Sequence, residues 1–190
     1  MKLLDTIVDF FYKRRAQKFL RETTREQSFV DYKNAQSILI LFESDYSEKN
    51  PEVRRIINDL RNDGKKVSAW GYINKKEITT AMLPDFRILN KQDADFSLCP
   101  KQNYVEELQG QHFDLMLDLS LKKTFFLQYL ALYANASCKV GTHIGFDKVH
   151  DFVIDFEQLQ TKDEELEITI NTTFVYNQMI FYLKKIQTND

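Results

Sequence analysis

The residues best placed to do chemistry are polar side chains that directly follow three apolar runs of the chain. They are Glu43, Ser44, Asp45, Ser120, Lys122, Lys123 and His143. In an open sheet of parallel strands, ligands bind beyond the carboxyl ends of the strands. Carboxylates, an imidazole and two ammonium groups gathered at one such rim would form a polar site. The sequence therefore predicts a ligand site at these residues. The alternative is a solvated rim, since strand ends are polar on every α/β domain.

Lys122 and Lys123 immediately precede a predicted helix that starts near Thr124. Cationic side chains and unpaired backbone amides at a helix N-terminus favour an anion such as phosphate. The ligand expected at the rim is an anionic metabolite, either a nucleotide or a sugar phosphate, and a solvated turn is the alternative. No catalytic residue is assigned, because the chain contains no GxSxG nucleophile motif.

The motifs that usually hold a cofactor are also missing. Neither GxGxxG nor GxxxxGK[ST], the common phosphate cradles, occurs in the sequence. Cys99 and Cys138 lie far apart and match no metal-ligand spacing, so we expect two buried, reduced thiols. The sequence therefore predicts no cofactor and no metal.

Asp118 stands inside the apolar run of residues 115–119. A buried carboxylate needs a hydrogen-bonding partner. We expect Asp118 to bind the turn at Ser120 or neighbouring amides, and no catalytic role follows from its position.

The elements that must position these residues alternate between strand and helix. Short apolar runs predict strands at 37–42, 66–73, 86–89, 115–119, 138–142 and 152–156. Helices are expected at 1–25, 51–62, 124–134 and 172–186, with Asn50 as the cap of the second and residues 163–165 as an acidic start to the last helix region. A short helix is expected at 74–83, and a surface loop at 91–100. This alternation predicts a three-layer, Rossmann-like α/β domain with a mostly parallel sheet of about five or six strands. Residues 37–187 would form the single domain, preceded by a basic amphipathic helix over 1–25.

Composition limits the classes of protein that the chain can belong to. With 190 residues, 43% hydrophobic residues and 15 phenylalanines, the chain can bury one ordinary core. A net charge of −2 gives no overall attraction to nucleic acid, so no nucleic-acid partner is expected. No apolar run reaches the ~18 residues of a membrane span, and the first residues do not follow the order of a secretory signal. We expect a cytoplasmic protein.

Positive charge is concentrated in the first 25 residues, which hold seven basic and three acidic residues and so carry +4, against −2 for the whole chain. One interpretation is a helix that lies on an anionic membrane surface, peripheral to the inner membrane of a bacterium. The other is a helix packed on the sheet, on a second copy in a homodimer, or on another protein partner.

The passage FDLMLDLS, followed by an apolar helix and CKVGTHIG, resembles the N-terminal half of heptosyltransferase-like glycosyltransferases with two Rossmann domains. The positions that carry the resemblance are Asp114, Asp118, Leu119, Lys139, Val140 and Gly141. It covers about 30 of the 190 residues. The chain has ESDYSEKN in place of the family's glycine-containing acceptor loop and is too short for its sugar-nucleotide domain. The resemblance therefore implies the fold and argues against a complete glycosyltransferase.

Length, composition and the basic first helix also resemble a family of uncharacterised proteins from Bacteroidota, a resemblance that implies no known activity. Three functional hypotheses remain. The leading one is a non-enzymatic binding or interaction module, dimeric through a terminal helix. The others are a small enzyme or binder of an anionic metabolite at the rim, and a peripheral membrane protein held by residues 1–25.

Overall fold

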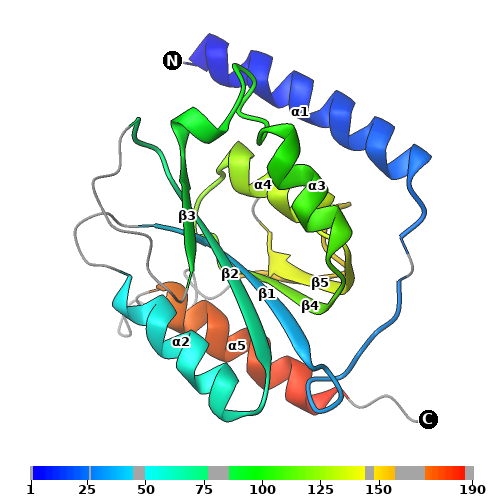
Figure 1. Ribbon diagram of the computed structural model, residues 1–190, viewed down its shortest axis with the longest axis vertical. Coiled ribbons are helices and arrows are strands. Elements are labelled where there is room, and N and C mark those ends of the chain that lie inside the picture. Colours follow the sequence, from blue (N-terminus) through cyan, green and yellow to red (C-terminus); the bar gives the residue numbers. More distant parts are fainter. Residues whose placement is uncertain are drawn as a thin grey trace.

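The computed structural model describes residues 2–25, 27–44, 50–76, 86–143, 148–156 and 170–186. Its centre is a six-stranded sheet in the order β3-β2-β1-β4-β5-β6, in which every neighbouring pair is parallel (Figure 1). The strands are β1 (Ser37–Glu43), β2 (Lys66–Ile73), β3 (Arg87–Asn90), β4 (Phe113–Asp118), β5 (Ala136–Thr142) and β6 (Phe152–Ile154). The predicted Rossmann-like α/β fold is confirmed. The strand order reverses between β1 and β4, which is the switch point of such a sheet.

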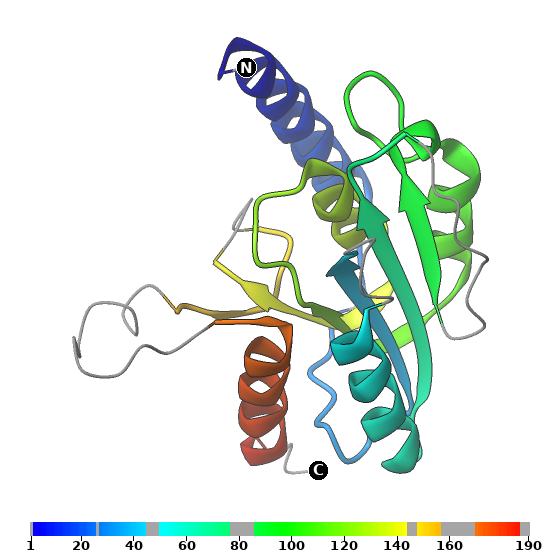
Figure 2. The same cartoon turned by 90° about the vertical axis from the view of Figure 1, so that its left-hand side faces the viewer.

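Helices cover both faces of the sheet and complete the three predicted layers (Figures 1 and 2). They are α1 (Lys2–Glu22), α2 (Pro51–Asn62), α3 (Gln102–Gly110), α4 (Phe125–Tyr133) and α5 (Thr172–Lys185). The helices α2 and α5 pack on one face, while α3 and α4 pack on the other and α1 lies outside α4. The central strand β1 is buried on both faces, because Ile38 and Ile40 point into the first core and Leu39 and Leu41 into the second.

The first helix packs on α4 through one face. Tyr12 is buried there with its ring centroid 4.8 Å from that of Tyr129, and Phe19 contacts Tyr133. The opposite face leaves Ile7 and Phe10 exposed. Apolar residues therefore occupy two faces of α1, which differs from the single apolar stripe of a simple amphipathic helix. Within the described residues, no helix has both the length and the apolar character needed to cross a bilayer.

Local details differ from the expectations at two places. Asn50 holds the N-cap position of α2, but its side chain makes no capping bond and donates instead to Ser44 Oγ at 3.1 Å. The segment 91–100, expected as a surface loop, contains a short 3₁₀ helix, η1 (Lys91–Asp93), and buries Ser97 and Cys99. Asp95 explains this burial, because its carboxylate accepts hydrogen bonds from the amides of both residues.

Two further expectations concern segments that are only partly described. The short helix expected over 74–83 and the acidic start of the last helix at 163–165 fall mainly or wholly outside the described residues. Cys99 and Cys138 are both buried and free, as expected.

Candidate functional site

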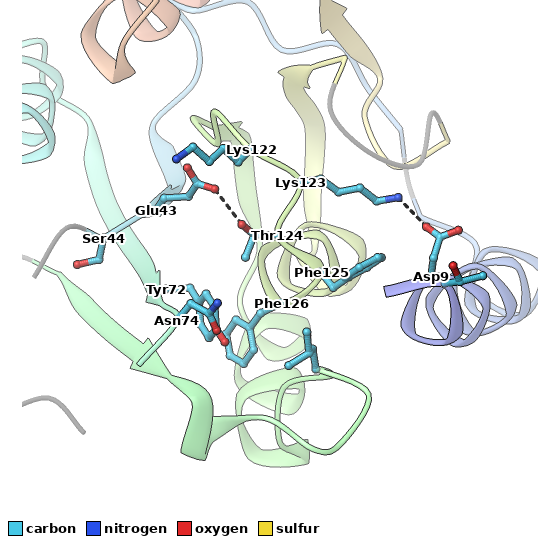
Figure 3. Close-up of a pocket in the computed structure, with 12 residues that line it drawn as sticks. Asp9, Glu43, Ser44, Tyr72, Asn74, Lys122, Lys123, Thr124, Phe125 and Phe126 are labelled. Atoms are coloured by element: carbon cyan, nitrogen blue, oxygen red, sulfur yellow. Dashed lines mark hydrogen bonds and ion pairs between the residues drawn. The ribbon is translucent and has the colours of Figure 1, made fainter. Parts of the chain in front are cut away.

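A cavity of about 880 Å³ opens at the carboxyl ends of β1 and β2, beside the loop that joins β4 to α4 (Figure 3). This is the switch point between β1 and β4, where open α/β sheets bind their ligands. The polar lining consists of Thr6, Asp9, Glu43, Ser44, Asn74, Lys122, Lys123 and Thr124. Aromatic and aliphatic side chains supply the rest, from Tyr72, Phe125, Phe126 and Leu98.

The structure brings together four of the seven site residues expected from the sequence, namely Glu43, Ser44, Lys122 and Lys123. Ser120 does not line the cavity, since it is buried against Asp118. His143 is exposed and also lies outside the lining. Asp45 falls outside the described residues.

Glu43 and Thr124 form the polar centre of the cavity. Thr124 Oγ1 donates a hydrogen bond to Glu43 Oε1 at 2.8 Å and makes no capping bond to its own helix, so its side chain leaves the first amides of α4 to other acceptors. Burial raises the pKa of Glu43, against the opposing effects of Thr124 and Lys122. A carboxyl group with a raised pKa exchanges a proton closer to neutral pH, and it also accepts hydrogen bonds from hydroxyl groups.

The two lysines of the rim have different surroundings. Lys123 Nζ lies 2.6 Å from Asp9 Oδ1 of α1 and 5.0 Å from the centre of the Phe125 ring (Figure 3). That hydrogen bond, reinforced by Lys13, lowers the pKa of Asp9. Lys122 is exposed and acts on Glu43 only through its charge, with no hydrogen bond or ion pair to a described residue, so its ammonium group is accessible to a ligand. The lining balances two ammonium groups with two carboxyl groups.

An aromatic wall completes the cavity. The Tyr72 ring stacks on Phe126 with 4.3 Å between centroids, and Tyr72 is 4% exposed. Its hydroxyl has no hydrogen-bond partner among the described residues. Leaving a buried hydroxyl unpaired costs about 1–3 kcal/mol, which a ligand with a polar group in reach would recover. Sequence reasoning passed over Tyr72, although its place near the carboxyl end of β2 is the signal that could have identified it.

A buried polar cluster lies between β4 and β5. Asp118 Oδ1 accepts hydrogen bonds from the amide of Ser120 at 3.1 Å and from its hydroxyl at 2.6 Å, which is the turn-binding role predicted for Asp118. His150 Nε2 lies 3.2 Å from the other carboxylate oxygen, close enough for an ion pair but not aligned for a hydrogen bond. In a nucleophile triad the histidine stands between serine and carboxylate. Here the carboxylate stands between the serine and the histidine, so the cluster does not have the order of such a triad.

Other features of the chain bear on cofactors. Among the described residues, no group of three or more histidine, cysteine, aspartate or glutamate side chains is arranged to hold a metal ion.

Asp114, which the sequence placed in the glycosyltransferase-like passage, accepts hydrogen bonds from the amides of Gln36 and Ser37 and so ties β4 to the start of β1.

Comparison with known proteins identifies a family. Residues 9–186 match the model of a family of unknown function, DUF6913. No curated protein matches the chain, and no solved structure matches it. Because the match extends over nearly the whole α/β domain and most of α1, the chain belongs to the DUF6913 family of unknown function.

Proposed function

We propose that the domain binds a small phosphorylated metabolite, a sugar phosphate or a nucleotide, in the cavity at the rim. The observation that carries this proposal is the coincidence of an 880 Å³ cavity with the switch point of the sheet. That volume lies within the ~300–1,000 Å³ range of pockets that bind small ligands.

The lining suggests a division of roles. Lys122 and the uncapped amides of α4 would hold the phosphate. Glu43 and Asn74 would accept and donate hydrogen bonds to hydroxyl groups of the sugar. The Tyr72–Phe126 pair would supply an apolar wall for a ring. In the glycosyltransferase-like passage, Asp114, Asp118 and Lys139 make contacts that hold the fold and do not line this cavity.

Replacing Lys122 with glutamine should weaken this binding about tenfold or more, because a hydrogen bond to a charged group contributes roughly 1.5–3 kcal/mol. Isothermal titration with glucose 1-phosphate and with UMP, for wild type and variant, measures the effect. Lys66→Gln is the matched control, since this exposed lysine lies at the opposite end of β2. The proposal fails if wild type shows no saturable binding at millimolar ligand, or if both variants weaken binding equally.

A second candidate function follows from the outer face of α1. Phe10 is 60% exposed and Phe96 83% exposed, and both contact Phe11 edge-on. Arg14 and Lys18 are exposed further along the same helix. Aromatic side chains next to basic ones are typical of a surface that lies on an anionic bilayer. We propose that this surface, consisting of Phe10, Phe96, Arg14 and Lys18, rests on anionic lipid.

Vesicle flotation tests this second candidate. Wild type should float with vesicles of phosphatidylglycerol and phosphatidylcholine at low salt, and high salt should release it because salt screens the attraction. The double variant Phe10→Ser, Phe96→Ser should stay in the dense fraction. Phe181→Ser, which removes a phenylalanine that is 49% exposed on α5, should float like wild type. Failure of wild type to float at low salt would exclude a lipid surface.

A further inference from the structure

A second cavity, of about 720 Å³, lies at the end of α1 away from the rim, between that helix, the end of α4 and the segment before β6. Its lining is basic. The titratable side chains among the described lining residues are Arg21, Arg25, His112, Tyr133, Lys139 and Lys148. None of these described lining residues carries a carboxylate, in contrast to the balanced lining of the rim cavity.

Three of these basic side chains, Arg25, Lys139 and His112, already make hydrogen bonds or ion pairs within the protein. Arg25 forms an ion pair with Asp151 and donates to the carbonyl of Ala136 at 2.7 Å. Lys139 Nζ donates to the carbonyls of Ala131 and Leu132 at 2.7 and 3.0 Å. His112 Nε2 lies 3.1 Å from the hydroxyl of Ser137. These contacts fix one wall of the cavity and leave its remaining cations to act on a ligand.

Arg21 and Lys148 are those remaining cations. Both are exposed, and neither makes a hydrogen bond or ion pair with the described residues. They come from separate segments, the last turn of α1 and the connection into β6, yet both line the same cavity. Like charges that converge on a concave surface concentrate the positive potential there and raise the local concentration of anions.

We propose that this cavity binds a phosphate-bearing anion, with Arg21 and Lys148 as its principal contacts. The guanidinium group of Arg21 suits the paired oxygens of a phosphate, and Lys148 adds a point charge. Thr23 and Thr24 line the cavity beside Arg21 and offer hydroxyl donors. The volume is large enough for more than a single phosphate group, which favours a diphosphate or an organic phosphate.

The test is isothermal titration of the full-length protein with inorganic pyrophosphate at low ionic strength. The double variant Arg21→Gln, Lys148→Gln should bind at least tenfold more weakly than wild type. The matched control is Lys66→Gln, Lys101→Gln, which removes the same charge from two exposed lysines outside the cavity. This control loses only the general attraction of two charges for an anion, which salt screens. It should therefore bind pyrophosphate within about twofold of wild type.

Two results would overturn the proposal. One is equal weakening in the cavity variant and in the control, which would assign the binding to net charge. The other is the absence of pyrophosphate binding by wild type. A third variant separates the two cavities, because Lys122→Gln should leave pyrophosphate binding unchanged here. If Lys122→Gln alone abolishes it, the anion binds at the rim and the second cavity is not its site.

Discussion

Gly141→Ala is expected to lower the free energy of unfolding by about 1–3 kcal/mol, the usual cost of adding a methyl group to a filled core. Gly141 lies in β5, against the imidazole of His150. A Cβ atom at this position would lie 2.5 Å from His150 Nε2 and 2.6 Å from its Cδ2. The ring is buried, and the same Nε2 atom lies 3.2 Å from Asp118 Oδ2, so a shift of the ring would disturb that contact. Urea unfolding of the two proteins measures the difference.

The same clash predicts that the two positions are energetically coupled. In a His150→Ala background the ring is gone, and Gly141→Ala should then cost close to nothing. The coupling energy of the double-mutant cycle should therefore be about as large as the single-variant cost. Gly110→Ala is the control, because a Cβ added there in α3 meets no atom within 4 Å. An equal cost of Gly141→Ala in both backgrounds would show that His150 is not the obstacle.

The strands were predictable because each is a short apolar run bounded by polar residues. Residues 37–42 form an unbroken apolar run after Ser37, and the structure places five fully buried side chains there. A strand with helices on both faces must be apolar on both sides, so this pattern leads directly to a parallel sheet. The strand order was not predictable, since several orders would bury the same runs.

The position of the rim cavity followed from the same logic, because parallel strands end at a common edge. That argument brought Glu43 and Lys122 together correctly from distant parts of the sequence. It could not show that Asp9 of α1 would neutralise Lys123, because the packing of α1 on α4 has no local signal. The argument also favoured His143, which is exposed, whereas the histidine buried beside Asp118 is His150, just before β6.

The second cavity could not be predicted from the sequence, because its lining depends on how distant elements pack. Its basic residues lie between Arg21 and Lys148 in the sequence, on elements that meet only after folding. Lys139 also stands inside a strand, where a lysine would be expected to reach solvent. It is buried instead, because its amine reaches the last carbonyls of α4, which otherwise lack donors.

The surroundings of Lys139 change its ionisation. Burial, reinforced by the nearby Arg25, lowers the pKa of Lys139 from 10.5 to about 7. A neutral amine has two N–H donors, and the carbonyls of Ala131 and Leu132 provide two acceptors. Between about pH 7 and 10.5 the unfolded chain therefore binds a proton that the folded chain does not. Stability must rise with pH across this window, by at most about 1.4 kcal/mol per pH unit.

Lys139→Met should remove this dependence. Between pH 7 and pH 9 the wild type should gain about 2 kcal/mol of unfolding free energy relative to the variant. Taking the difference cancels the other groups that titrate in this range, such as the Cys138 thiol, whose pKa burial raises to about 11. The loss of a donor to two carbonyls of α4 also changes the stability of the variant, but by the same amount at every pH, so it does not alter the expected difference in pH dependence. Urea unfolding at pH 7, 8 and 9 measures both effects, with Lys148→Met as a control that removes an exposed lysine from the same cavity.

If wild type and Lys139→Met keep the same pH dependence, Lys139 is charged in the folded protein, and its ammonium group would then add to the positive charge available to an anion in the second cavity.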